Sequence, residues 1–221
     1  MLRFADFCVI LNIMEILFLV VILIFSVMIH EIAHGSVAYH LGDPTAKYAG
    51  RLTLNPLKHL DPIGSVIVPL FLVIMSQLGG GGIIFGWAKP VPINPYNFRD
   101  QKYGSLKVAF AGPLSNLSVA IVFGLILRFV PFLVSIPGLV IIFSYIIYIN
   151  ILLAIFNLIP IPPLDGSHIL FALLPYQAKS IERFLRQFGI FVLLFILLFA
   201  FPYLSVIINW IFNFLTGFTL L

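Results

Sequence analysis

The sequence is poor in charged residues and nearly lacks cysteine. Of its 221 residues, 9% are Asp, Glu, Lys or Arg and 62% are hydrophobic. Soluble domains carry roughly 25% charged residues, so this composition argues against one and predicts an integral membrane protein. The single cysteine, Cys8, excludes an intramolecular disulfide framework and a second metal ligand of this type. The formal net charge of +4 does not indicate nucleic-acid binding, and we expect no nucleic-acid partner.

Helix-breaking residues, in contrast, are frequent. Fifteen prolines and sixteen glycines are many for a bundle of simple spanning helices, and they favour broken or re-entrant segments. The apolar runs between them predict an all-α polytopic membrane protein with about five to six membrane segments, and we treat residues 1–221 as a single domain. Helices are expected at about residues 14–41, 62–78, 106–130 and 139–158, and further apolar segments at 187–201 and 203–221.

One long stretch cannot be helical. Four consecutive glycines at 79–82 are followed by Pro90, Pro92 and Pro95. Prolines at this spacing remove helical hydrogen-bond donors and hold the chain extended. We therefore predict a re-entrant, extended Gly/Pro-rich ribbon, which must be sheltered from lipid because its backbone cannot satisfy its own polar groups.

A metal-binding pattern lies at the end of the first apolar run. His30-Glu31-Ile32-Ala33-His34 places two imidazoles one helical turn apart, so both can bind one zinc ion, with Glu31 as general base. The alternative is a purely structural role, in which the two histidines pack against a neighbouring helix and Glu31 lies in solvent. Ionisable groups after residues 16–29, which are almost all apolar, cost roughly 2.5–3.5 kcal/mol each at the bilayer centre. A bound cation explains all three at once.

A catalytic zinc usually has three protein ligands and a water, so a third ligand is required. Acidic residues are scarce, and Asp165 stands out because it follows Pro160, Pro162 and Pro163 in a broken helix. Taken alone, Asp165 is more typical of a helix cap. Beside the histidine pair, we favour Asp165 as the third ligand of one Zn²⁺ per chain.

These motifs resemble the site-2 protease family of intramembrane zinc metalloproteases. The resemblance rests on His30–His34 and on the segment from Asn157 to Gly166, and it extends over Gly86-Trp87-Ala88-Lys89-Pro90 and Ala111-Gly112-Pro113. It implies His30, His34 and Asp165 as zinc ligands, Glu31 as catalytic base, and Asn157 as a catalytic hydrogen-bond donor. Asn116 matches a second asparagine of the family, which we assign to substrate binding. The chain is similar to the minimal members, which have no appended regulatory domain.

The metal ligands also constrain topology. His34 lies near one membrane face at the end of the first helix, and Asp165 must lie near the same face to reach the same metal. The two expected helices at 106–130 and 139–158 cross the membrane and return, so the chain before them must also start from this face. The stretch from residue 62 to 94 must therefore cross the membrane an even number of times. Most basic residues then lie on the face of the metal: Lys47, Arg51, Lys58, Arg99, Lys102, Lys107, Lys179, Arg183 and Arg186. This bias predicts a multi-pass protein of the cell membrane with its active site toward the cytoplasm.

The expected substrate is a single-span membrane protein within the lipid bilayer. A helical substrate must unwind before cleavage, and the ribbon can pair with the unwound stretch by strand addition. Ile84, Phe85, Gly86 and Trp87 are therefore predicted to bind substrate, although Trp87 is equally typical of a headgroup anchor.

Two other function classes remain open from the residues alone. A metal or ion transporter would also place polar groups at broken helices, but it leaves Glu31 unexplained and predicts a repeat that the sequence does not show. A non-proteolytic membrane scaffold is the third class. A Glu31→Gln change distinguishes them, because only hydrolysis requires the carboxylate.

Overall fold

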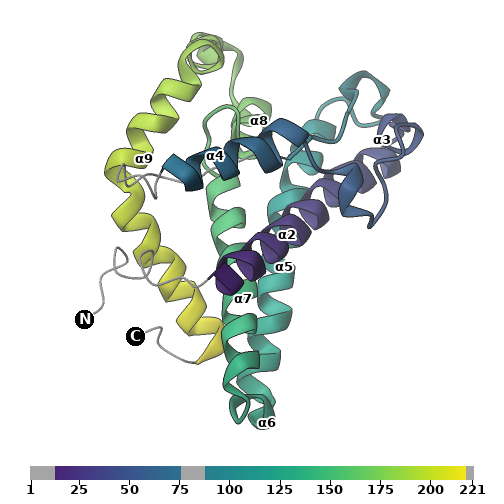
Figure 1. The fold of residues 1–221 in the computed structure, drawn as a ribbon. Coiled ribbons are helices and arrows are strands. Elements are labelled where there is room, and N and C mark those ends of the chain that lie inside the picture. Colours follow the sequence, from purple (N-terminus) through teal and green to yellow (C-terminus); the bar gives the residue numbers. More distant parts are fainter. Residues whose placement is uncertain (1–12, 76–87, 218–221) are drawn as a thin grey trace.

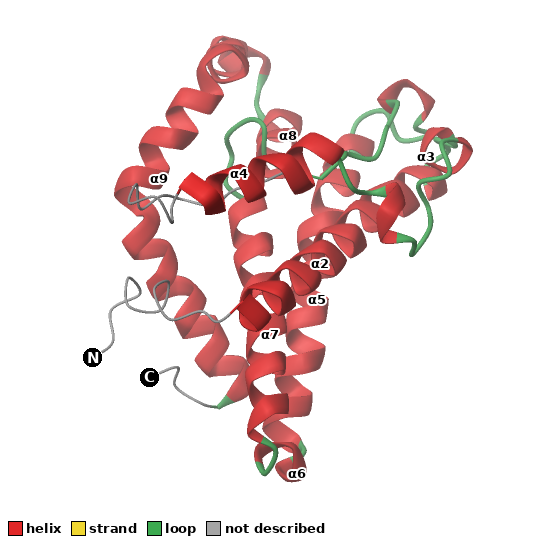
Figure 2. Cartoon of the chain, viewed as in Figure 1, coloured by secondary structure: helices red, strands yellow, loops and turns green. Residues whose placement is uncertain are grey.

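The computed structural model describes residues 13–75 and 88–217 (Figure 1). Within these residues every regular element is a helix (Figure 2), which confirms the all-α prediction. The α-helices are α2 (Ile13–His40), α3 (Thr45–Tyr48), α4 (Val68–Met75), α5 (Gly104–Phe129), α6 (Pro131–Val134), α7 (Pro137–Asn157), α8 (Asp165–Leu173) and α9 (Lys179–Thr216). Short 3-10 turns occur at Pro56–Lys58, Pro95–Asn97 and Tyr176–Ala178, and a π-helix at Pro62–Ile67.

Three of these helices are long and apolar enough to cross a membrane. They are α5, α7 and the part of α2 from Phe18 to His40. The two parts of α9, Lys179–Phe199 and Tyr203–Thr216, meet at an angle of 71°, and they make a fourth span if they cross together. The chain is thus an integral membrane protein. The predicted five to six segments are not confirmed. The expected helix over 62–78 is described only to Met75, as the short π-helix and the eight-residue α4, and these residues are too few for a span.

The core forms where α5, α7 and the second half of α9 meet. α5 and α7 run side by side and are joined by the short α6, while α2 crosses in front of them (Figure 1). Ile147, Ile151, Ile208 and Phe212 are almost fully buried between these helices. Gly124 allows the close approach, because a Cβ there would lie 3.0 Å from the Leu215 Cβ. Small residues are typical of such contacts between membrane helices.

The end of α2 lies directly against the chain that leads into α5. The Arg99 amide donates to the Leu41 carbonyl at 2.7 Å, and the Asn94 amide donates to Asp43 Oδ2 at 2.7 Å. Asp43 is fully buried, and its Oδ1 also accepts from the Asn97 amide group at 2.8 Å. α2 therefore ends on the side of the molecule on which α5 begins, as the even number of crossings requires.

A tight turn after α7 brings α8 back toward α2. α7 ends at Asn157, and the turn over residues 158–164 leads into α8 at Asp165. Gly166 packs on this turn so closely that a Cβ there would lie 2.5 Å from the Ile159 carbonyl oxygen. Only glycine permits this approach, and the approach sets the position of its neighbour Asp165.

Candidate metal centre

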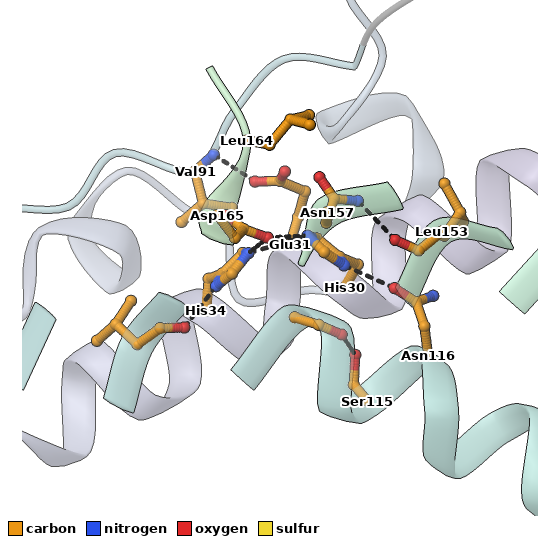
Figure 3. Close-up of polar contacts among 12 residues, drawn as sticks. His30, Glu31, His34, Val91, Ser115, Asn116, Leu153, Asn157, Leu164 and Asp165 are labelled. Atoms are coloured by element: carbon orange, nitrogen blue, oxygen red, sulfur yellow. Dashed lines mark hydrogen bonds and ion pairs between the residues drawn. The ribbon is translucent and has the colours of Figure 1, made fainter. Parts of the chain in front are cut away.

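His30 and His34 lie in the second half of α2 and are both buried. One helical turn separates them, so their rings lie 4.5 Å apart between centroids, edge to face. Their Nε2 atoms are 3.0 Å apart. Both rings turn toward α5 and α8 (Figure 3). The sequence expectation of two imidazoles directed at one point is therefore met.

Asp165 completes a group of three ligand atoms. Its Oδ2 lies 3.0 Å from His30 Nε2 and 3.2 Å from His34 Nε2. Among the described residues, these three side chains form the group of His, Cys, Asp and Glu that is compact enough for a metal ion. The alternative of a helix cap does not hold, because Asp165 is the first residue of α8, Leu164 is the cap residue, and no side chain caps this helix. Asp165 points to the histidines instead.

The partners of the outer ring nitrogens determine which nitrogen can bind metal. His34 Nδ1 lies 2.7 Å from the Val108 carbonyl oxygen, and His30 Nδ1 lies 2.6 Å from Asn116 Oδ1. Oxygens of this type only accept, so both Nδ1 atoms must carry hydrogen, and each neutral ring then has a lone pair on Nε2. Two lone pairs and the buried Asp165 Oδ2, which has no hydrogen-bond partner, thus face one another. These electron pairs repel one another, and a cation bound between them removes the repulsion.

The dimensions of the group fit zinc. Ligand atoms placed tetrahedrally at about 2.0–2.1 Å from zinc lie roughly 3.3 Å apart, close to the observed 3.0–3.2 Å. Gly112 of α5 keeps the space open, because a Cβ there would lie 2.5 Å from His30 Nε2 and would also overlap His34. Two imidazoles and one carboxylate are a donor set typical of catalytic zinc, which retains a free fourth position.

Asp165 stays ionised in this environment. Its burial raises the pKa of the carboxyl group, but the interactions with His30 and His34, whose Nε2 atoms lie 3.0 and 3.2 Å from Oδ2, outweigh burial and lower the pKa to about 2. A metal ion binds only neutral imidazoles and an ionised carboxylate, so its affinity weakens as the pH falls.

Glu31 lies next to the ligand group and is held by the chain before α5. Its Oε2 accepts a hydrogen bond from the Val91 amide at 2.7 Å (Figure 3). Val91 belongs to the segment 88–94, which is neither helix nor strand. Buried Arg51 fixes this segment, because its guanidinium donates to the Lys89 carbonyl at 2.7 Å and the Pro90 carbonyl at 3.0 Å, and also to the Lys58 carbonyl. The Val91 amide therefore fixes the direction of Oε2, while Oε1 does not take part in this hydrogen bond.

Asn116 lies in the interior of the protein, against His30. The side chain is fully buried, with its oxygen on His30 and its Nδ2 bonded to the Asn150 Oδ1 at 2.8 Å and the Ser26 carbonyl at 3.1 Å. Both Nδ2 hydrogens and the acceptor facing His30 are used within the protein. Asn116 therefore bonds a candidate metal ligand, and its contact with substrate stays a prediction.

The other predicted residues are placed only in part. Asn157 is the last residue of α7, is half-buried, and donates from Nδ2 to the Leu153 carbonyl at 3.0 Å. Ile84, Phe85, Gly86 and Trp87 lie outside the described residues. Sequence reasoning missed the Val91 amide and the space left by Gly112. The Ala111-Gly112-Pro113 motif was the available signal for the latter.

Comparison with known proteins agrees with this geometry. The sequence is 41% identical over 187 residues to "Putative zinc metalloprotease YwhC" of Bacillus subtilis (strain 168), covering 81% of this chain and 80% of that protein. The profile of peptidase family M50 matches residues 133–200. The chain belongs to peptidase family M50, the site-2 protease family. The M50 protein is thus a zinc metalloprotease with Zn²⁺ as its cofactor.

More distant relatives carry a similar name. "Putative zinc metalloprotease Rip2" of Mycolicibacterium smegmatis is 29% identical over 181 residues, which cover 78% of this M50 chain and 63% of that protein. Rip2 of Mycobacterium tuberculosis (strain ATCC 25618 / H37Rv) is 28% identical over 191 residues, with 85% and 67% covered. No solved structure matches the chain.

Proposed function

We propose that this M50 protein is an intramembrane protease, which hydrolyses a peptide bond within or near the transmembrane segment of a single-span membrane protein. The observation that carries the proposal is the position of the candidate zinc ligands. His30 and His34 lie within the apolar span of α2, and Asp165 reaches them from the turn after another candidate span, α7. We take residues 1–221 as one metalloprotease domain in the bilayer, acting in regulated intramembrane proteolysis.

In this proposal each residue of the centre has one task. His30, His34 and Asp165 hold the zinc ion, which when bound supplies a Lewis acid and lowers the pKa of a water to about 7. Glu31 accepts a proton from the attacking water and delivers it to the leaving amine. The water oxygen bonds to the carbonyl carbon first, the C–N bond then breaks as the amine receives the proton, and one water is consumed. The Val91 amide keeps one Glu31 oxygen fixed, so that the other meets the water.

Asn157 is proposed as a hydrogen-bond donor to the reacting carbonyl oxygen. Its Nδ2 uses one hydrogen on the Leu153 carbonyl, so the second hydrogen of the same nitrogen is available to a substrate. The bond to Leu153 orients the amide. This pre-orientation is what a donor to a developing negative charge needs.

Residues 84–87 are proposed as the strand that pairs with the unwound substrate. The adjacent segment cannot take this role, because the Lys89 amide donates to the His59 carbonyl at 3.0 Å, the Val91 amide donates to Glu31, and Pro90 has no amide hydrogen. The positive charge on the metal's side of the molecule supports a cytoplasmic orientation of the site.

The proposal is tested with Glu31→Gln. The wild type and the variant are purified in detergent, bound zinc is measured, and each is incubated with a panel of single-span membrane peptides. We expect stoichiometric zinc in both and cleavage in the wild type alone, with a loss of at least 1,000-fold in the variant, on the order of general acid–base catalysis. Equal cleavage by the two proteins would rule out Glu31 as the base.

A further inference from the structure

Beyond the ligand set, the membrane helices bury a second group of polar side chains. Ser26 of α2, Asn116 of α5 and Asn150 of α7 are 4%, 0% and 0% exposed. An unpaired amide in such surroundings is costly, so the three side chains must satisfy one another. Asn150 belongs neither to the proposed ligands nor to the residues that meet substrate, and its role is open.

The orientation of the Asn150 amide is fixed by its neighbours. Its Nδ2 donates to the Ile146 carbonyl at 2.8 Å and to Ser26 Oγ at 2.9 Å. A backbone carbonyl only accepts, so the nitrogen must occupy this position. The oxygen of Asn150 is therefore turned toward Asn116, where it accepts from Nδ2 at 2.8 Å.

This oxygen in turn decides which end of Asn116 meets His30. Asn116 Nδ2 spends its two hydrogens on the Asn150 oxygen and on the Ser26 carbonyl at 3.1 Å. Its own oxygen is left for His30 Nδ1, at 2.6 Å. In the reversed orientation an amide nitrogen would face Nδ1, the His30 hydrogen would move to Nε2, and no lone pair would remain for a metal.

We propose that Asn150 is a positioning residue of the zinc centre, which acts through Asn116 to hold His30 in its metal-binding tautomer. The inference rests on the proposed function, because it needs His30 as a zinc ligand. The network joins α2, α5 and α7, so the packing of three membrane helices sets the state of one imidazole. Asn150 touches neither the metal ligands nor a substrate.

Zinc affinity, measured by competition with a chromogenic chelator, is the first test. We expect Asn150→Leu, which keeps the volume and removes the acceptor, to weaken zinc binding about tenfold, as for other outer partners of metal-ligating histidines. Asn150→Asp keeps an oxygen toward Asn116 in either protonation state and should bind zinc nearly as the wild type does. Thr216→Val is the matched control, because it removes a buried hydroxyl of α9 that is bonded to the Phe212 carbonyl.

An Asn116→Asp background separates orientation from simple structural support. A carboxylate has no nitrogen end, so it accepts from His30 whichever way it turns. Asn150→Leu should then have no further effect on zinc affinity, although it costs about tenfold beside Asn116. An equal loss in both backgrounds would overturn the inference, as would unchanged affinity in the single variant. Absence of zinc from the wild type would instead overturn the proposed function, and this inference with it.

Discussion

At the scale of single residues, Gly112 determines the space in which a metal can sit. A methyl group at this position would overlap both imidazoles of the candidate centre. We expect Gly112→Ala to lower zinc affinity on the order of 100-fold, because ligand geometry tolerates displacements of well under 1 Å. Equilibrium dialysis against buffered zinc measures the zinc affinity of the variant and of the wild type.

Gly138 provides the matched control for this change. It also lies in a membrane helix, α7, but a Cβ there would meet nothing within 4 Å. Gly138→Ala should leave zinc binding unchanged and stabilise the helix by up to about 1 kcal/mol. Equal zinc affinity in the two alanine variants would show that the Gly112 gap is not needed for the metal.

The ligand group was predictable from sequence for a physical reason that the supporting residues lack. His30 and His34 are one helical turn apart, and Asp165 is one of few acids in the chain, so composition and periodicity single them out. Asn150 lies in another apolar stretch than Ser26 and His30, and only the packing of α2 against α7 brings it to them. Asn150 was visible as a polar residue in an apolar run, but nothing in the sequence names its partner.

At the scale of elements, Arg51 connects the loop after α2 to the segment that holds Glu31. Its planar guanidinium bonds three backbone carbonyls at once, which a lysine ammonium cannot match in geometry. We expect Arg51→Lys to loosen Val91 from Glu31 and to lower kcat roughly 10- to 100-fold. Zinc affinity should not change.

The control for Arg51→Lys is the same exchange at an exposed site. Arg186 pairs with Glu182 one turn away on α9, at a position worth little to stability. Steady-state cleavage by Arg186→Lys should match the wild type. A drop in the zinc content of the Arg51 variant would contradict this prediction. It would mean that Arg51 supports the metal ligands and does not act on Glu31 through Val91.

Asp43 ties the end of α2 to the start of α5, and its contribution depends on pH. Burial raises the pKa of this carboxyl, but the hydrogen bonds from Thr45, Asn94 and Asn97 outweigh it, so the pKa lies below the usual value of 3.8. A lowered pKa stabilises the fold at pH values above 3.8, and the stabilisation is lost as the pH falls through the folded-state pKa.

Asp43→Asn should therefore destabilise the protein most at neutral pH. We expect a loss of about 1–3 kcal/mol there, which shrinks once the pH falls below 3.8. Thermal unfolding of the zinc-free wild type and variant across this range measures the difference and removes the effect of metal release. A gap between the two curves that stays constant to the lowest pH would contradict the assignment.

At the scale of the whole molecule, topology was predicted better than the number of spans. The parity argument needed only that His34 and Asp165 share a metal, and the hydrogen bond between Arg99 and Leu41 agrees with it. The count of five to six segments treated every apolar run as a span. Hydrophobicity alone does not tell a re-entrant run from a crossing, because both lack charge, and the described part of α4 ends at Met75.

The orientation itself can be tested with single cysteines. Replacing Cys8 by serine leaves a chain without native thiols. Lys47, Lys102 and Lys179 lie at the metal's end of the candidate spans, and Phe132, 70% exposed, lies in the turn between α5 and α7 at the other end. In intact cells, a membrane-impermeant maleimide should label a cysteine at Phe132 and spare the other three until the cells are opened.

Labelling of Lys102→Cys but not Lys47→Cys would mean an odd number of crossings before α5, which the contact between Arg99 and Leu41 opposes. Labelling of all three with protection of Phe132→Cys would keep the parity but place the zinc centre toward the outer face.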